Sequence, residues 1–173
     1  PGRYITVINT DRGSIPLEHG VTILATGGRE SRIYEHGFRA KKNVLTQMEL
    51  EDKLADGSLD VGALEGAAMI QCWRSRDEGR AYCSRVCCQA ALKNVLKLKE
   101  KDPDLPVYVF YRDIMTYGFA ESYYTKARQA GAIFIQYDMN NKPKVTFEDD
   151  KPVITVYDNV LGQEIQVHAD ILA

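Results

Sequence analysis

Short apolar runs alternate with longer stretches of helical spacing through the second half of the chain. The apolar runs are residues 67–71, 107–111 and 132–137, and residues 84–101 and 121–130 lie between them. Runs this short predict strands, whereas apolar residues three or four positions apart predict helices. Because a strand–helix–strand–helix–strand order is typical of a parallel sheet, we expect an α/β fold with a Rossmann-like βαβαβ unit.

The pattern changes to shorter segments towards the C-terminus. Residues 144–147, 152–157 and 164–168 read as strands, and turn-forming residues separate them. Consecutive strands joined by short turns pair in antiparallel fashion. We therefore expect an antiparallel β-meander after the parallel sheet.

Two further strands are expected near the N-terminus. The first is Tyr4–Ile8, which is followed by a turn at Asp11–Ser14. The second is Gly20–Gly28, an unbroken apolar run that ends in small residues. Such a run is typical of a strand covered on both faces, so we expect this strand to be buried. Residues 29–42 are polar and predict a loop.

A helix is expected from Thr46 to Leu54, because Thr46 and Glu49 have the spacing of a capping box. The turn residues 56–58 end this helix. We expect one domain to contribute residues 1–60, as strands and a connecting helix. A second, Rossmann-like domain should occupy residues 61–173.

Composition and charge narrow the class of protein. The chain has 173 residues, of which 45% are hydrophobic and 27% are charged. These values are ordinary for a soluble globular protein. The net charge is −2, so the chain lacks the excess of basic residues that is typical of nucleic-acid-binding proteins. No apolar stretch is long enough to cross a membrane, and no signal peptide is present, so we expect a cytoplasmic protein. Both ends read as strands of a larger protein.

Four cysteines lie within one short window, and the rest of the chain has none. They are Cys72, Cys83, Cys87 and Cys88, in the pattern C-x10-C-x3-C-C. Cys72 follows the first strand of the α/β unit, and ligands of open α/β sheets gather at that carboxyl edge. Four thiolates can bind tetrahedral zinc or a [4Fe–4S] cluster, and the spacing alone leaves both open. Disulfides suit the chain less well, because a protein of this size needs none for its core.

The segment after the first strand also argues against a nucleotide. A dinucleotide-binding unit carries G-x-G-x-x-G at this position, whereas residues 71–78 contain no glycine. Without glycine the backbone cannot approach a pyrophosphate closely, so we expect no NAD(P) site. The pair Arg112 and Asp113 ends the second strand, where such domains read a ribose, and we expect it to form salt bridges instead.

Basic residues accompany the cysteines. Arg74, Arg76, Arg80 and Arg85 lie in the cysteine window, and Ser84 can cap the helix that carries Cys87 and Cys88. Arginine side chains and a helix N-terminus both stabilise an anionic group. A solvated loop with surface salt bridges is an equally good explanation of the arginines.

The cysteine window resembles the A-type subunit of heterodisulfide reductases, an iron–sulfur flavoprotein. The resemblance is carried by residues 69–78 and 82–88 and continues through residues 107–114 and 123–134. Upstream, residues 23–28 and 45–51 also match. The resemblance therefore covers nearly the whole chain.

The resemblance implies a fold and a set of cofactors. The fold would be that of thioredoxin-reductase-like flavoproteins, in which a flavin domain is interrupted by a pyridine-nucleotide domain. The inserted domain would hold a [4Fe–4S] cluster on Cys72, Cys83, Cys87 and Cys88, with Arg74, Arg76 and Arg85 around it. Ala25, Thr26 and Gly27 would lie near FAD in the full-length protein.

The resemblance also implies a function, which is electron transfer in an oxidoreductase complex. The cluster would exchange electrons with FAD, and the partners would be the rest of the parent chain and other redox subunits. The first βαβ unit of a flavin domain and ferredoxin-type cysteine motifs are absent from this sequence. We therefore expect the chain by itself to be inactive. The alternatives are a zinc-stapled or metal-free docking domain and a degenerate NAD(P)-binding domain.

Overall fold

The computed structural model describes residues 2–28, 30 and 40–173. It divides into two compact units, residues 1–31 and 32–173, which we describe separately. Within the described ranges, no helix combines the length and the apolar character needed to span a bilayer.

The first unit is a β-hairpin. Strands β1 (Tyr4–Thr10) and β2 (Gly13–His19) pair in antiparallel register, with Thr10 opposite Gly13 at the turn. The strand and the turn expected in this region are confirmed, and β2 is an addition. Almost every residue of both strands is exposed within the unit.

The buried strand expected at Gly20–Gly28 is absent. Residues 21–28 have no regular secondary structure and are exposed, and Ile23 and Leu24 retain 83% and 86% of their accessible surface. An apolar run becomes a buried strand only where neighbouring strands supply hydrogen bonds and cover. Among the described residues, no strand pairs with this segment. The loop expected at residues 29–42 includes residues 29 and 31–39, which lie outside the residues that the structure describes.

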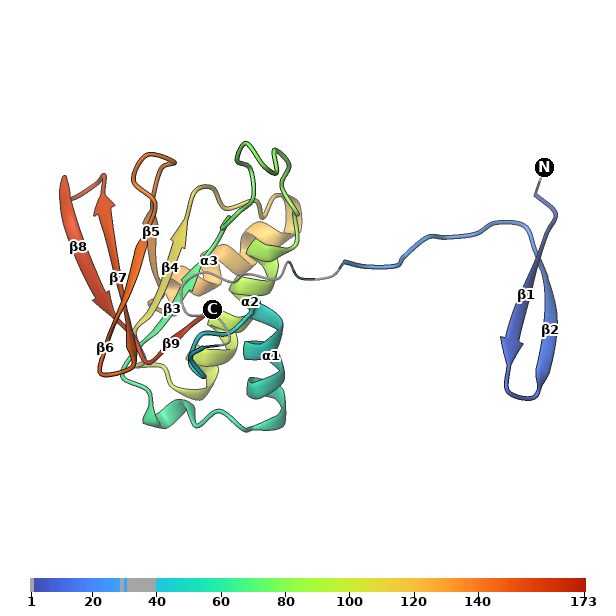
Figure 1. The fold of residues 1–173 in the computed structure, drawn as a ribbon, viewed down its shortest axis with the longest axis horizontal. Helices are drawn as coiled ribbons and strands as arrows, with labels where there is room; N and C mark the ends of the chain where they lie inside the picture. The colour runs from blue at the N-terminus through green and yellow to red at the C-terminus, as the bar shows by residue number, and fades with distance from the viewer. Residues whose placement is uncertain (1, 29, 31–39) are drawn as a thin grey trace. The chain divides into compact units, whose positions relative to one another are not determined.

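The second unit contains a parallel sheet of four strands in the order β5-β4-β3-β9. These strands are Ile133–Gln136, Val107–Tyr111, Ala67–Ile70 and Ile171–Leu172, respectively. Helix α2 (Cys87–Lys101) connects β3 to β4, and the 3-10 turn η2 (Gly118–Ala120) and helix α3 (Glu121–Gln129) connect β4 to β5 (Figure 1). The expected βαβαβ unit is confirmed, and β9 extends the sheet on its other side.

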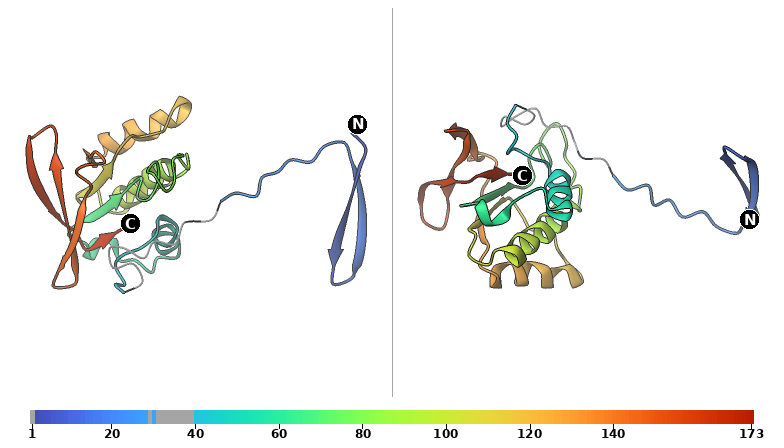
Figure 2. Two further views of the ribbon diagram at one scale, coloured as in Figure 1. Left: turned by 45° about the horizontal axis from the view of Figure 1, so that its top comes forward. Right: turned by 90° about the horizontal axis from the view of Figure 1, so that it is seen from below.

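Strands β6 (Lys144–Glu148), β7 (Lys151–Asp158) and β8 (Gln163–His168) form the expected antiparallel meander. This meander covers one face of the parallel sheet, and the helices cover the other (Figure 2). Successive side chains of β3 alternate between the two layers, since Ala67 and Met69 pack with the helices and Ala68 packs with the meander. The sheet is therefore buried on both faces.

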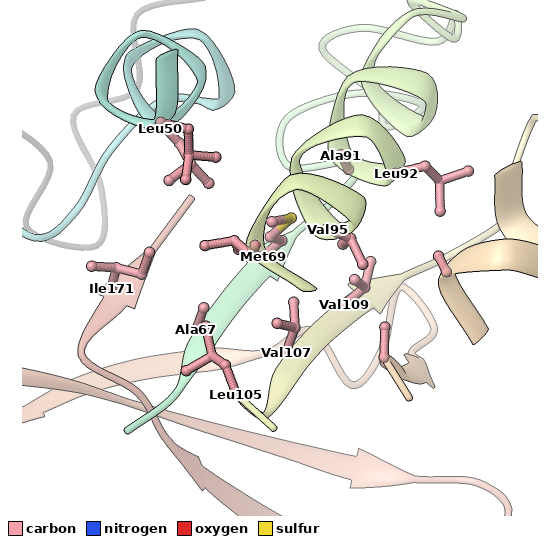
Figure 3. Close-up of a cluster of buried hydrophobic side chains, with 14 of the residues drawn as sticks. Leu50, Ala67, Met69, Ala91, Leu92, Val95, Leu105, Val107, Val109 and Ile171 are labelled. Carbon is pink, nitrogen blue, oxygen red and sulfur yellow. The ribbon is translucent and has the colours of Figure 1, made fainter. Parts of the chain in front are cut away.

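Helix α1 (Gln47–Asp56) begins and ends as the sequence predicts. The Thr46 hydroxyl accepts a hydrogen bond from the Glu49 amide, and the Glu49 carboxylate accepts one from the Thr46 amide. Gly57 ends the helix in the left-handed conformation, with φ of 75°. Leu50 of α1, Met69 of β3 and Val95 of α2 belong to one buried hydrophobic cluster (Figure 3).

Helix α2 begins later than expected. Its first residue is Cys87, its N-cap is Val86, and Ser84 does not cap it. Arg85 has φ of 64°, so the chain leaves the helical path between Ser84 and Cys87.

Residues 43–45 and Leu172 lie side by side in the second unit. The Leu45 amide donates to the Leu172 carbonyl, and the Leu172 amide donates to the Asn43 carbonyl. The 3-10 turn η1 (Val61–Ala63) follows α1, and α1 packs on α2. Residues 40–60 therefore pack with the second unit in this chain, and the division at residue 60 stays a prediction about the parent protein.

Candidate metal centre

The four cysteines lie at the carboxyl edge of the parallel sheet. Cys72 follows the end of β3 by two residues, and Cys83 lies in the long loop that leads to α2. Cys87 and Cys88 are the first two residues of α2. Cys83 thus lies outside the helix, in the loop before it.

The thiols are free and act on one another electrostatically. Cys88 is buried, and the other three are partly buried. Burial raises the pKa of Cys87, and the charges of Cys72 and Cys83 raise it further. Burial likewise raises the pKa of Cys88 to about 11, with contributions from the other three cysteines. All four thiols thus lie in the loop after β3 or in the first turn of α2, at the same edge of the sheet.

Backbone amides donate to two of the sulfurs. The Arg85 amide lies 3.3 Å from Cys83 Sγ, and the Met115 amide lies 3.5 Å from Cys88 Sγ. Hydrogen bonds of this type stabilise thiolate ligands and tune iron–sulfur clusters. The position of Cys87 and Cys88 in the first turn of α2 adds the partial positive charge of the helix N-terminus.

The loop that carries Cys72 has an unusual backbone. Cys72, Arg74 and Arg76 have φ values of 62°, 51° and 61°, in the left-handed region that favours glycine. A non-glycine residue in such a conformation persists only where its surroundings fix it. This loop therefore takes tight turns where a nucleotide-binding loop would use glycine.

The predicted arginines occupy different positions. Arg76 Nη1 lies 2.6 Å from Asp113 Oδ2, and this bond, with a smaller contribution from Cys72, raises the pKa of Arg76. Arg74 and Arg85 are exposed. The guanidinium of Arg80 stacks on the Tyr82 ring. Arg76 is thus the basic residue with the clearest link to a cysteine.

The residues fit a thiolate-bound group by their chemistry. Four sulfur donors, N–H donors to two of them and a nearby guanidinium are what an anionic metal centre requires. The side chains do not form a closed ligand set, because no group of three or more His, Cys, Asp or Glu in the described part of the chain is arranged to hold a metal ion.

Two positions near the cysteines were not singled out by sequence. The Met115 amide is one, and the Tyr137 hydroxyl, which donates to the Gln71 carbonyl at 2.6 Å, is the other. The sequence offered one indication for Tyr137, which is its position at the end of the strand predicted at residues 132–137. Ala25, Thr26 and Gly27 belong to the exposed segment of the first unit, and their role near FAD stays a prediction.

Two solved structures have a similar fold. The fold of this chain is similar to that of thioredoxin reductase of T. acidophilum, with a TM-score of 0.51 and 13% identity over 99% of this chain and 51% of that one. It is also similar to L-lysine 6-monooxygenase of Pseudomonas syringae, with a TM-score of 0.50 and 12% identity, over 97% of this chain and 47% of that one. The class of protein is therefore the α/β fold of thioredoxin-reductase-like proteins, as expected.

Sequence comparison identifies the relatives, which are A-type subunits of heterodisulfide reductases. The chain is 36% identical over 170 residues to that of the ferredoxin/F(420)H(2)-dependent CoB-CoM heterodisulfide reductase of Methanosarcina acetivorans, and the match covers 90% of the chain. It is 34% identical over 177 residues to the iron-sulfur A-type subunit of the CoB–CoM heterodisulfide reductase of Methanocaldococcus jannaschii, and this match covers 91%. No protein-family model matches.

These matches confirm the resemblance seen in the cysteine window. The chain is a relative of the A-type subunit of heterodisulfide reductases and corresponds to one segment of it. It spans 21% of the Methanosarcina acetivorans protein and 26% of the Methanocaldococcus jannaschii protein.

Proposed function

We propose that this chain is an electron-transfer module that holds a [4Fe–4S] cluster on Cys72, Cys83, Cys87 and Cys88. The observation that carries the proposal is the gathering of every cysteine of the chain at one sheet edge, in a segment related to an iron-sulfur subunit. When bound, such a cluster accepts and donates single electrons.

The residues around the thiolates have two roles in this proposal. The amides of Arg85 and Met115 donate to sulfur and lower the cost of its negative charge. The side chains of Arg74, Arg76 and Arg85, together with the α2 N-terminus, offset the net negative charge of the site. Both effects favour the reduced state of the site.

The module would work inside a larger oxidoreductase. The name of a relative from Methanococcus maripaludis describes one subunit of a heterodisulfide and ferredoxin reductase. We propose that the parent protein has heterodisulfide reductase-like activity, binds FAD near Ala25, Thr26 and Gly27, and assembles with other redox subunits. A cytoplasmic location remains part of this proposal.

The proposal is tested by metal content and spectroscopy. After anaerobic reconstitution, the chain should contain about four iron ions and about four acid-labile sulfides and give an EPR signal when reduced. Cys87→Ala should lose most of the iron, whereas Ser84→Ala, a change in the same loop, should retain it. Failure of the wild-type chain to bind iron would refute the proposal.

Two alternatives predict other results. A zinc-stapled docking domain would bind zinc in stoichiometric amount and stay colourless. A degenerate NAD(P) domain would bind NADH with measurable affinity. The NAD(P) alternative is disfavoured because residues 71–78 contain no glycine and turn tightly at Cys72, Arg74 and Arg76. Such a backbone cannot approach a pyrophosphate closely.

A further inference from the structure

The loop that carries Cys72 and Cys83 is tied to the end of the neighbouring strand β4. Arg112, the first residue after β4, donates from Nη1 to the Ser75 carbonyl at 3.2 Å and to the Arg76 carbonyl at 2.9 Å. The Arg112 carbonyl in turn accepts a hydrogen bond from Gln136 Nε2 at 2.9 Å. Arg112 therefore links the cysteine loop, β4 and β5.

The residues that follow Arg112 contact the other half of the cysteine set. The Asp113 carbonyl lies 3.7 Å from Cys88 Sγ, and the Met115 amide lies 3.5 Å from the same sulfur. The Asp113 carboxylate pairs with Arg76 of the cysteine loop. One short segment, residues 112–115, thus touches both the loop that carries Cys72 and the helix start that carries Cys88.

A second anchor comes from the end of β5. The Tyr137 ring is almost fully buried, and its hydroxyl donates to the Gln71 carbonyl, one residue before Cys72. Gln71 is itself buried, and its amide donates to the Phe110 carbonyl of β4. The backbone before Cys72 is therefore held by β4 and by the residue that follows β5.

We propose that Arg112 is a positioning residue that fixes the cysteine loop 71–83 against the start of α2 and places a permanent positive charge within that loop, at the carbonyls of Ser75 and Arg76. The effect of the Arg112 charge on a cluster rests on the proposed function. The positioning of the loop by Arg112 concerns the metal-free protein and does not depend on that function. In a dinucleotide-binding domain, the end of the second strand reads the ribose of the cofactor. Here that position holds the protein's own cysteine loop.

The mechanism follows from the contacts. Left-handed turns at Cys72, Arg74 and Arg76 cost free energy, so the loop needs external bonds to keep them. Arg112 supplies two charge-assisted bonds to carbonyls within this stretch, and such bonds are stronger than neutral ones. Its charge would also favour the more anionic, reduced form of a cluster bound by this loop.

The geometric part is tested on the metal-free chain by amide hydrogen exchange. Arg112→Gln should speed exchange of the loop 71–83 amides by about tenfold or more, because the two carbonyls lose their cationic donor. Arg128→Gln is the matched control, since Arg128 lies on the exposed side of α3 and contacts the Tyr124 ring. Unchanged exchange in the loop of a folded Arg112→Gln protein would overturn the proposal.

The electrostatic part is tested after reconstitution. Arg112→Gln should lower iron retention between about 10-fold and 100-fold and shift the midpoint potential downward. Arg112→Lys, which keeps the charge, should keep the potential nearer to that of the wild type. A potential that is equal in all three proteins would reject the charge effect.

The outcomes separate the two proposals. A wild-type chain that binds no iron refutes the electron-transfer function, while the exchange data still decide the positioning role. If Arg112→Gln does not fold, Arg112→Lys replaces it, because lysine keeps the charge but lacks the planar guanidinium that donates to both carbonyls. Faster exchange in the loop 71–83 of this variant supports the positioning role of Arg112, and unchanged exchange rejects it.

Discussion

At the scale of single residues, the cysteine loop departs most from what its sequence suggests. Three alternate positions, Cys72, Arg74 and Arg76, adopt the left-handed conformation without being glycine. Each such residue costs on the order of 1–3 kcal/mol. The sequence predicted the four cysteines as one site, because residue type and spacing are local information. It could not predict the backbone between them, which hydrogen-bonds to Arg112 and Tyr137, residues that follow strands β4 and β5.

Removal of the Tyr137 hydroxyl should destabilise the fold. Tyr137→Phe leaves the Gln71 carbonyl, in a buried position, without this donor, and we expect a loss of about 1–3 kcal/mol in the free energy of unfolding. Tyr157→Phe, on the exposed side of β7, is the control and should change it by less than about 0.5 kcal/mol. Urea denaturation of both variants measures the difference. Equal losses would contradict the role of the hydrogen bond.

At the scale of elements, helix boundaries were predictable where a local signal sets them. Helix α1 has both its capping box and its terminal Gly57, so its limits follow from neighbouring residues. Helix α2 lacks a side-chain cap, and its start is set by the turn at Arg85, which the sequence does not mark. The prediction of a buried strand at residues 20–28 was wrong for a different reason. An apolar run forms a strand only where another strand pairs with it, and the sequence of the run does not show whether such a strand exists.

Loss of the α1 cap should be measurable as lower stability. Thr46→Ala removes the hydroxyl that accepts the Glu49 amide, and we expect a cost of about 1 kcal/mol. Thr125→Ala on the exposed face of α3 is the matched control, and it should be neutral or slightly stabilising because alanine favours helices. Thermal unfolding of both variants separates the cap from a general effect of the threonine methyl and hydroxyl.

At the scale of the whole second unit, one carboxylate ties distant segments together. Asp170 accepts hydrogen bonds from the Glu65 and Gly66 amides, and it pairs with Lys151 at 2.8 Å. Burial alone would raise the pKa of Asp170, but the Lys151 ammonium and the two amides outweigh burial and lower it. These contacts join the start of β3, the start of β7 and the approach to β9.

The lowered pKa predicts how stability changes with pH. Because the folded state holds the Asp170 carboxylate in its ionised form, this contribution is present at neutral pH and is lost as the pH falls below about 4. Asp170→Asn should therefore reduce the free energy of unfolding by about 1.5–3 kcal/mol at pH 7. The gap between variant and wild type should narrow in acid.

The control for this experiment is a charge change elsewhere. Asp52→Asn lies on the exposed surface of α1 and alters the net charge equally. Denaturant unfolding at a series of pH values compares the three proteins. A gap between Asp170→Asn and wild type that stays constant from pH 7 to acid would show that the carboxylate contributes nothing through its charge.

Asn43 and Leu45 exchange backbone hydrogen bonds with Leu172, so the two ends of the segment 43–172 lie next to each other. A segment whose ends meet can be joined into another protein through a single surface loop, because its ends need not be spread apart. We therefore expect the segment 43–172 to tolerate transfer into a different host loop as one piece.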